Sequence, residues 1–160
     1  AGFSDKTLLE SGLVLKHPEK GSYYDRFRGR LMFPIFDSRG RAIGFGARTL
    51  KEEEPKYINT PETVVFSKGR NLYGLHWIRE EIRESKTLYI VEGYLDVILP
   101  YQAGIKGMVA TLGTALTQDH LRLIRRYVDR VVLVFDADEA GSKASERGMD
   151  LLLSENVDLF

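Results

Sequence analysis

Short apolar runs alternate with amphipathic segments in the second half of the chain. The apolar runs predict strands over Thr87–Val91, Lys106–Thr111 and Arg130–Phe135, and a fourth strand that starts at Val157. The segments between them predict helices over 94–103, 117–127 and 139–154, the first of them kinked near its end by Pro100. Strands that alternate with helices and short loops indicate βαβ units, and therefore a parallel sheet flanked by helices on both faces.

The first half has a different pattern. Ser4 is an N-cap candidate for a helix over residues 5–15, which Pro18 would close. Residues 31–36 and 42–45 predict two strands joined by the turn Asp37-Ser38-Arg39-Gly40, and Pro34 suggests an edge position for the first strand. Residues 51–61 are polar and proline-punctuated, as in a loop, and residues 72–85 predict a helix.

The change of pattern divides the chain. We expect residues 1–86 to form a small mixed α+β subdomain and residues 87–160 to form the parallel α/β domain. The chain stops within the apparent fourth strand, so the second domain is expected to be truncated at its C-terminus.

Composition excludes several classes of protein. The 160 residues carry 23 Lys+Arg and 23 Asp+Glu, and the 43% hydrophobic share is typical of a soluble globular protein. The longest apolar runs are far shorter than the ~20 residues of a membrane span. The absence of Cys excludes disulfides and a Cys-based zinc site in this chain. With no secretory signal at residues 1–10, a cytoplasmic location is the expectation.

The zero net charge hides an asymmetry. Residues 1–50 hold 9 basic and 5 acidic side chains, whereas residues 87–160 hold 7 basic and 11 acidic ones. A basic half can pair with phosphates and an acidic half can hold metal ions, although both could equally be solvated surfaces.

Three carboxylates fall at the ends of predicted strands. Glu92 directly follows the strand 88–91, Asp136 follows the strand 131–135, and Asp138 comes two residues later. In an open parallel sheet the carboxyl ends of the strands form the ligand-binding edge, so neighbouring strands would bring these acids together. Acids this close could not all stay ionised without cations, and hard oxygen ligands suit Mg²⁺ or Mn²⁺.

Two further features lie at the same predicted edge. Asp96 comes one helical turn after Glu92 and could be a further ligand, a residue that orients the ligands, or an acid that favours the helix dipole. The loop Thr111-Leu112-Gly113-Thr114 could offer amide and hydroxyl donors to phosphate oxygens, with Gly113 and Thr114 the candidate contacts.

Basic and aromatic residues of the first half are candidates for nucleic-acid contact. Arg26, Arg28 and Arg30 alternate, so on a strand all three would project from one face and could track phosphates, or protect a solvated edge strand. Lys56 could contact a triphosphate with Arg48 nearby, and Tyr57 could stack on a base or simply pack.

These motifs resemble the Toprim domain, and more specifically the bacterial (DnaG-type) DNA primase family. The Toprim marks are Glu92-Gly93 after one strand and Asp136-Ala137-Asp138 after another. The primase resemblance extends to Val91–Val97, Ala110–Thr117 and Phe135–Gly141, although the family more often has Gly and Arg where this chain has Ala137 and Glu139. It also covers the first half, through Asp25–Ile35, Gly44–Arg48, Pro55–Thr63 and Leu72–Leu75.

The resemblance implies the central RNA-polymerase core of a primase. Such a core, a nucleotidyltransferase, synthesises short RNA primers from ribonucleoside triphosphates on single-stranded DNA during replication, using Mg²⁺ or Mn²⁺. It implies a cytoplasmic location at the nucleoid or replisome. The family's zinc-binding domain, its domain that binds the replicative helicase and its Asp-Pro-Asp motif are absent from this chain, so the fragment alone could be inactive.

The resemblance also implies roles. Asp136 and Asp138 would be metal ligands and Glu92 a ligand or the proton acceptor, while the first half would face template and incoming nucleotides with its basic residues. Two rival hypotheses are a piece of a Toprim nuclease or topoisomerase, and a non-enzymatic nucleic-acid-binding module. A topoisomerase would need a catalytic Tyr in a separate domain for which the chain has no room, and a binding module would show no dependence on divalent metal.

Overall fold

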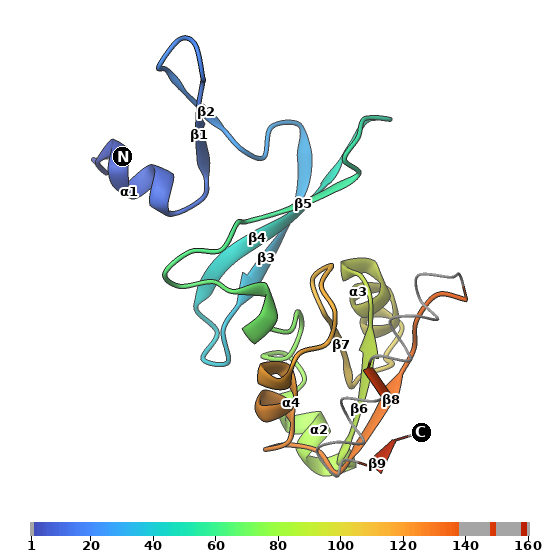
Figure 1. The fold of residues 1–160 in the computed structure, drawn as a ribbon. Helices are drawn as coiled ribbons and strands as arrows, with labels where there is room; N and C mark the ends of the chain where they lie inside the picture. The colour runs from blue at the N-terminus through green and yellow to red at the C-terminus, as the bar shows by residue number, and fades with distance from the viewer. Residues whose placement is uncertain (1, 138–147, 150–157, 160) are drawn as a thin grey trace. The chain divides into compact units, whose positions relative to one another are not determined.

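The structure is a computed structural model that describes residues 2–137, 148–149 and 158–159 (Figure 1). Its backbone contacts divide the chain into two compact units. The N-terminal unit comprises Ala1–Phe36 and Arg41–Ser67, and the C-terminal unit comprises Asp37–Gly40 and Lys68–Phe160. The tip of one hairpin therefore belongs to the second unit. The division after residue 86, which rests on the change of sequence pattern, stays a prediction.

The N-terminal unit contains one short helix and two antiparallel sheets. Its elements are α1 (Asp5–Glu10), β1 (Val14–Lys16), β2 (Tyr23–Asp25), β3 (Arg30–Phe36), β4 (Ala42–Thr49) and β5 (Tyr57–Asn59). One sheet pairs β1 with β2, and the other has the order β3-β4-β5. The predicted N-cap is confirmed, since Ser4 Oγ accepts a hydrogen bond from the Thr7 amide.

The helix ends earlier than predicted because the chain turns at Gly12. Its φ of +71° lies in the left-handed region, and a Cβ there would come within 2.7 Å of Pro61 Cδ. Residues 14–16 then form β1 instead of the last helical turn.

The hairpin of β3 and β4 is confirmed, and β3 is an edge strand as Pro34 indicated. The predicted loop 51–61 is wrong at its end, because residues 57–59 form β5 and pair with the last part of β4. Buried Thr60 ties this sheet together, since its Oγ1 accepts from the Phe45 amide and donates to the Phe45 carbonyl.

The predicted row of three arginines on a strand is wrong. Residues 26–29 form the turn between β2 and β3, so Arg26 and Arg28 are not in an extended strand, and only Arg30 begins β3. The Arg28 guanidinium lies 4.7 Å from the centre of the Tyr24 ring, and Arg30 donates to the Pro55 carbonyl at 2.9 Å. The arginines occur at every second residue, which is typical of one face of a strand, but residues of a turn can be spaced in the same way.

The C-terminal unit contains the predicted parallel sheet. Its elements are the 3-10 helix η1 (Lys68–Arg70), α2 (Arg79–Ser85), β6 (Thr87–Val91), α3 (Tyr94–Gln102), β7 (Met108–Ala110), α4 (Gln118–Ile124), β8 (Arg130–Leu133) and β9 (Asp158–Leu159). The strand order is β7-β6-β8-β9, and each neighbouring pair is parallel. The predicted helix 139–154 lies largely outside the described residues.

The predicted helix over 72–85 is correct only from Arg79 onward. Tyr73 instead makes an antiparallel bridge with Ala110, exchanging two backbone hydrogen bonds of 2.9 and 3.1 Å. This isolated bridge joins Tyr73 to β7, and the turn at residues 74–77 follows it. Leu72, Leu75 and Ile78 lie in the core.

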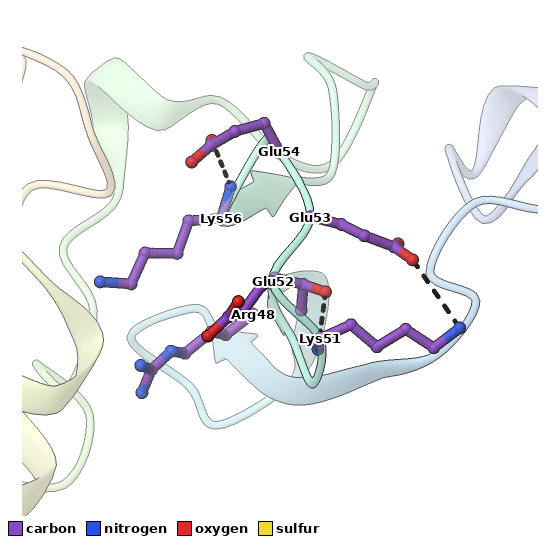
Figure 2. A pocket seen from close by; sticks show the side chains of 7 residues that line it. Arg48, Lys51, Glu52, Glu53, Glu54 and Lys56 are labelled. Atoms are coloured by element: carbon purple, nitrogen blue, oxygen red, sulfur yellow. Dashed lines mark hydrogen bonds and ion pairs between the residues drawn. The ribbon is translucent and has the colours of Figure 1, made fainter.

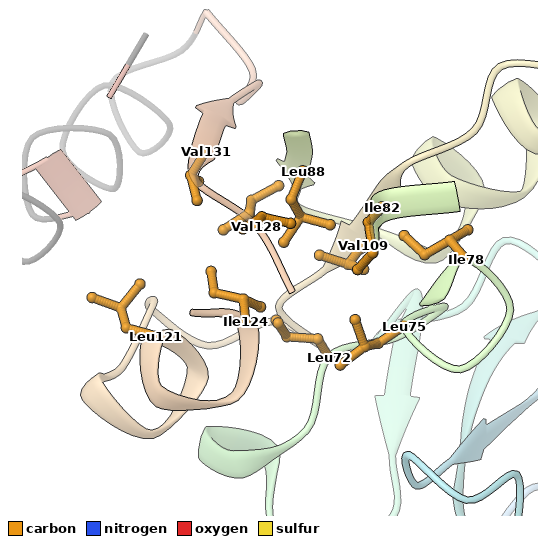
Figure 3. Packing of buried hydrophobic residues seen from close by; sticks show 11 residues of the cluster. Leu72, Leu75, Ile78, Ile82, Leu88, Val109, Leu121, Ile124, Val128 and Val131 are labelled. Atoms are coloured by element: carbon orange, nitrogen blue, oxygen red, sulfur yellow. The ribbon is translucent and has the colours of Figure 1, made fainter. Parts of the chain in front are cut away.

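The core of this unit is a cluster of aliphatic side chains between the sheet and helices α2 and α4 (Figure 3). Ile82 of α2, Leu88 of β6, Val109 of β7 and Ile124 of α4 have no exposed surface. Each such side chain stabilises the fold by about 1.5–3 kcal/mol. This core fixes the sheet whose strands β6 and β8 lead to Glu92 and Asp136. No helix of the described residues is long and apolar enough to cross a membrane.

Candidate metal centre and basic pocket

The topology brings the ends of three strands to one edge of the sheet. Val91 of β6 lies opposite Ala110 of β7, and Ile90 lies opposite Leu133 of β8. One further hydrogen bond, from the Val134 amide to the Ile90 carbonyl at 2.9 Å, continues the pairing beyond β8. The residues that follow these strands therefore share one edge, as the order of elements predicted.

Glu92 and Asp136 lie side by side at this edge. The Asp136 amide donates to Glu92 Oε1 at 3.3 Å, so the Glu92 side chain spans from the end of β6 to the segment after β8. Asp136 is exposed and Glu92 is half-buried. Asp138, the third predicted acid, lies outside the described residues, and so do Glu139 and Gly141.

Asp96 lies in the first turn of α3. Its Oδ2 accepts a hydrogen bond from the Gly93 amide at 3.0 Å, and Gly93 is the N-cap of the helix. Of the three roles that the sequence left open, this contact favours that of a residue that orients the ligands, because it holds the backbone next to Glu92.

The acids border an open pocket of about 350 Å³. Glu92, Asp96 and Asp136 supply its polar rim, and its apolar wall comes from β6, α3, β7 and the segment after β8. The apolar lining residues are Val91, Leu95, Leu99, Pro100, Met108, Val134 and Phe135. A pocket that presents carboxylates to solvent beside an apolar wall can admit a hydrated cation and a ligand bound to it.

The donor set fits a hard divalent cation. Glu92 and Asp136 offer carboxylate oxygens at an exposed edge, which is the chemistry that Mg²⁺ and Mn²⁺ prefer. Among the described residues no three acids or histidines gather closely enough to enclose an ion. Mg²⁺ bound through one or two carboxylates usually keeps several waters.

The loop after β7 has an unusual backbone. Leu112 and Gly113 have φ values of +62° and +70°, and Leu112 is buried whereas Gly113 is exposed. A Cβ at residue 113 would meet nothing within 4 Å, so its left-handed φ, not space, favours glycine. Leu112 holds a conformation that costs a non-glycine residue about 1–3 kcal/mol, and such strain clusters at functional sites.

Sequence reasoning missed the side chains that hold this loop at its far end. Buried His120 accepts from the Thr117 amide through Nδ1 and contacts the Lys68 carbonyl through Nε2 at 2.8 Å. Thr117 Oγ1 also donates to the Gly69 carbonyl at 2.6 Å. Because Nδ1 accepts the Thr117 amide, Nε2 carries the hydrogen and donates it to the Lys68 carbonyl, and burial, which lowers the pKa of His120, favours this neutral ring. The sequence signal was Thr117 three residues before His120, an N-cap pattern.

Tyr94, next to the Glu-Gly pair, does not face the pocket. It is buried against Tyr73, with the ring centres 4.6 Å apart, and burial raises the pKa of both phenols, that of Tyr73 to about 12. Neither hydroxyl would therefore ionise near neutral pH to act as a nucleophile.

The N-terminal unit has a separate pocket of about 380 Å³ that contains Arg48 and Lys56 (Figure 2). Arg48 lies in β4 and Lys56 directly precedes β5; the Thr49 amide donates to the Lys56 carbonyl, and the Arg48 and Lys56 side chains extend to the same side. The Arg48 guanidinium lies 5.9 Å from the centre of the Tyr57 ring. Lys51 extends to the other side, where it pairs with Glu53 at 3.7 Å.

Three consecutive acids, Glu52, Glu53 and Glu54, line the same pocket. Sequence reasoning singled out Arg48, Lys56 and Tyr57 in this region and did not consider the glutamates. The pocket is therefore mixed in charge, and a phosphate that approaches Arg48 and Lys56 also meets carboxylates.

The sheet with a Glu-Gly after β6 and an Asp after β8 defines a Toprim-type domain. A family model for the Toprim domain matches residues 86–160, and one for the N-terminal domain of the DNA primase catalytic core matches residues 1–79. The chain belongs to the family of DnaG-type DNA primase catalytic cores.

Individual relatives agree with this assignment. The DNA primase of Deinococcus radiodurans is 52% identical over 153 residues, which is 95% of this chain and 27% of that protein. The DNA primase of Clostridium acetobutylicum is 46% identical over 99% of this chain and 26% of its own length. The chain thus spans about a quarter of these relatives.

Solved structures match in fold as well. The zinc-binding and RNA polymerase domains of the Aquifex aeolicus primase superpose with a TM-score of 0.88 at 44% identity, over 97% of this chain and 38% of that one. A DnaG primase catalytic domain bound to single-stranded DNA gives 0.88 at 42% identity, over 96% of this chain and 49% of that one. The predicted fold class and family are confirmed, and the nuclease, topoisomerase and binding-module alternatives are not favoured.

Proposed function

We propose that this chain is the catalytic core of a DNA primase that joins ribonucleotides into short primers on a single-stranded DNA template. The placement of Glu92 and Asp136 at one edge of a Toprim-type sheet carries the proposal. The primase relatives and the relative bound to single-stranded DNA support it. Ribonucleoside triphosphates, the growing RNA primer and the replicative helicase are the proposed partners of the intact protein in the bacterial cytoplasm.

The carboxylates of Glu92 and Asp136, with Asp138 beyond the described residues, would hold Mg²⁺ or Mn²⁺. A bound cation would lower the pKa of the attacking ribose hydroxyl and neutralise charge on the leaving pyrophosphate. Glu92 is either a ligand or the acceptor of the hydroxyl proton. Its hydrogen bond from the Asp136 amide, at 3.3 Å, is compatible with both roles.

Other residues would position the substrates. Gly113 and Thr114 follow the strained Leu112 and present backbone amides at the same edge of the sheet as the acids. In the N-terminal unit, Arg48 and Lys56 would bind phosphates of the nucleotide or template, and Tyr57 offers a ring for stacking. Arg26, Arg28 and Arg30 would contribute charge from the turn between β2 and β3 and from the first residue of β3.

The decisive experiment compares Asp136→Asn with Asp129→Asn in the intact protein. Both changes remove one exposed carboxylate, but Asp129 precedes β8 and lies at the opposite edge of the sheet. We expect primer synthesis from ribonucleoside triphosphates and Mg²⁺ on single-stranded DNA to fall about 100-fold or more in Asp136→Asn, as when a group that stabilises the transition state is removed. Asp129→Asn should retain it, and an equal loss in both variants would contradict the proposed site.

A further inference from the structure

We propose that Asp96 is a positioning residue that fixes the Glu92–Gly93 peptide, and that it is not a ligand of the divalent cation. This inference deepens the proposed function and rests on it for the role of Glu92. Its observations are the contacts of one carboxylate at the start of α3.

The Asp96 carboxylate supplies an acceptor that the backbone needs. The first amides of a helix have no carbonyl partner within the helix. Here the N-cap Gly93 has no side chain to offer, and Asp96 Oδ2 accepts from the Gly93 amide at 3.0 Å across three residues. The negative charge also lies in the first helical turn, where the helix dipole favours it.

This hydrogen bond holds the residue that carries the chemistry. The Gly93 amide belongs to the same planar peptide as the Glu92 carbonyl, so fixing it limits the backbone rotation that directs the Glu92 side chain. Glu92 Oε1 in turn accepts from the Asp136 amide at 3.3 Å. Asp96 therefore acts on the pair Glu92 and Asp136 through the backbone.

The glycine of the Glu-Gly pair fits this contact. Gly93 has φ −123° and ψ 169°, an extended conformation that any residue can adopt, so its backbone does not require glycine. A Cβ at this position would instead lie 3.0 Å from Asp96 Oδ2. Glycine leaves the space in which the carboxylate reaches the amide.

The test compares Asp96→Asn with Asp96→Ala in the intact protein. Both lose the same charge, but only the asparagine keeps an oxygen that can accept from the Gly93 amide. Mn²⁺ affinity, measured from the electron paramagnetic resonance signal of free Mn²⁺, should fall about 10-fold further in Asp96→Ala than in Asp96→Asn, as for loss of a residue that orients metal ligands. Gly93→Ala should weaken Mn²⁺ binding while leaving every carboxylate in place.

A second readout does not depend on metal. Hydrogen exchange of the Gly93 amide, followed by NMR in the metal-free protein, should be slow in the wild type and in Asp96→Asn, and fast in Asp96→Ala. Equal loss of Mn²⁺ affinity in the two variants would show that Asp96 is a ligand. A fast-exchanging Gly93 amide in the wild type, or wild-type Mn²⁺ affinity in Asp96→Ala, would also overturn the inference. If the wild type bound no Mn²⁺, the proposed metal centre would fail, while the amide measurement would still decide whether Asp96 holds the peptide.

Discussion

Single side chains can fix the connections between elements. His120 is the clearest case, because a neutral imidazole both caps α4 and contacts the Lys68 carbonyl of η1. The three histidines of the sequence do not have the spacing of a metal site, and the signal for this one is Thr117 three residues before it. Its role depends on a partner 52 residues away, which only the fold brings into contact.

His120 makes stability depend on pH in a definite direction. Because burial lowers its pKa below 6.5, the unfolded chain takes up a proton at a pH where the folded chain does not. The stabilisation is complete above pH 6.5 and is lost as the pH falls below it, by up to about 1.4 kcal/mol per pH unit for one such group. The free energy of unfolding should therefore decrease from pH 7 toward pH 5.

The free energy of unfolding at each pH can be measured by urea unfolding followed by Trp77 fluorescence. Trp77 is the chain's one tryptophan and lies in the C-terminal unit. His120→Gln should lower stability at pH 7 and flatten the pH dependence. His76→Gln is the necessary comparison, because burial also lowers the pKa of His76. An unchanged pH dependence in His120→Gln would assign the titration elsewhere.

Among the elements, the parallel strands were predicted best and the connections worst. The strand β6 was predicted at its observed bounds, because a continuous apolar run between two polar segments has one simple interpretation. The segment 72–78 was predicted as helix because its apolar residues recur at helical spacing, but pairing with Ala110 outweighs that pattern. The turn at residues 26–29 and the strand β5 likewise depend on contacts distant in the sequence.

The same limit applies to the site. Strand ends are visible in a sequence, so Glu92 and Asp136 could be predicted to lie together. That Asp96 accepts from the Gly93 amide, and that three glutamates line the pocket of Arg48 and Lys56, depends on side-chain geometry that spacing alone does not give.

The connection between the paired strands β4 and β5 leads to a prediction about the binding of single-stranded DNA. Arg48 and Lys56 extend to one side of this element, whereas Lys51 extends to the other and pairs with Glu53. We expect Lys56→Ala to weaken binding of a single-stranded DNA oligonucleotide and to reduce the slope of log K against log salt by about 0.7, the value for one lost phosphate contact. Fluorescence anisotropy across a salt series measures both.

Lys51→Ala is the matched control, since it removes the same charge from the same loop. Its salt dependence should stay near that of the wild type. If both variants change the slope equally, the effect is one of net charge, and Lys56 has no specific contact.

On the scale of the whole molecule, each unit carries its own candidate site. The C-terminal unit holds the carboxylates of Glu92 and Asp136 at the ends of its strands, and the N-terminal unit holds the mixed-charge pocket of Arg48 and Lys56. The chain spans about a quarter of its curated primase relatives. The proposed primer synthesis is therefore the activity of the intact protein that contains this core.

Binding of a divalent cation to the proposed metal centre should raise the free energy of unfolding of the C-terminal unit. A ligand that binds only the folded state raises the free energy of unfolding by about 2.7 kcal/mol at 100 times its dissociation constant. Mn²⁺ should therefore stabilise the wild type in urea unfolding followed by Trp77 fluorescence. Without metal, Asp136→Asn should equal or exceed the wild type in stability, because it relieves repulsion between neighbouring carboxylates. Mn²⁺ should stabilise Asp129→Asn as it does the wild type, but not Asp136→Asn. Equal stabilisation of all three proteins would place the bound cation away from the ends of β6 and β8.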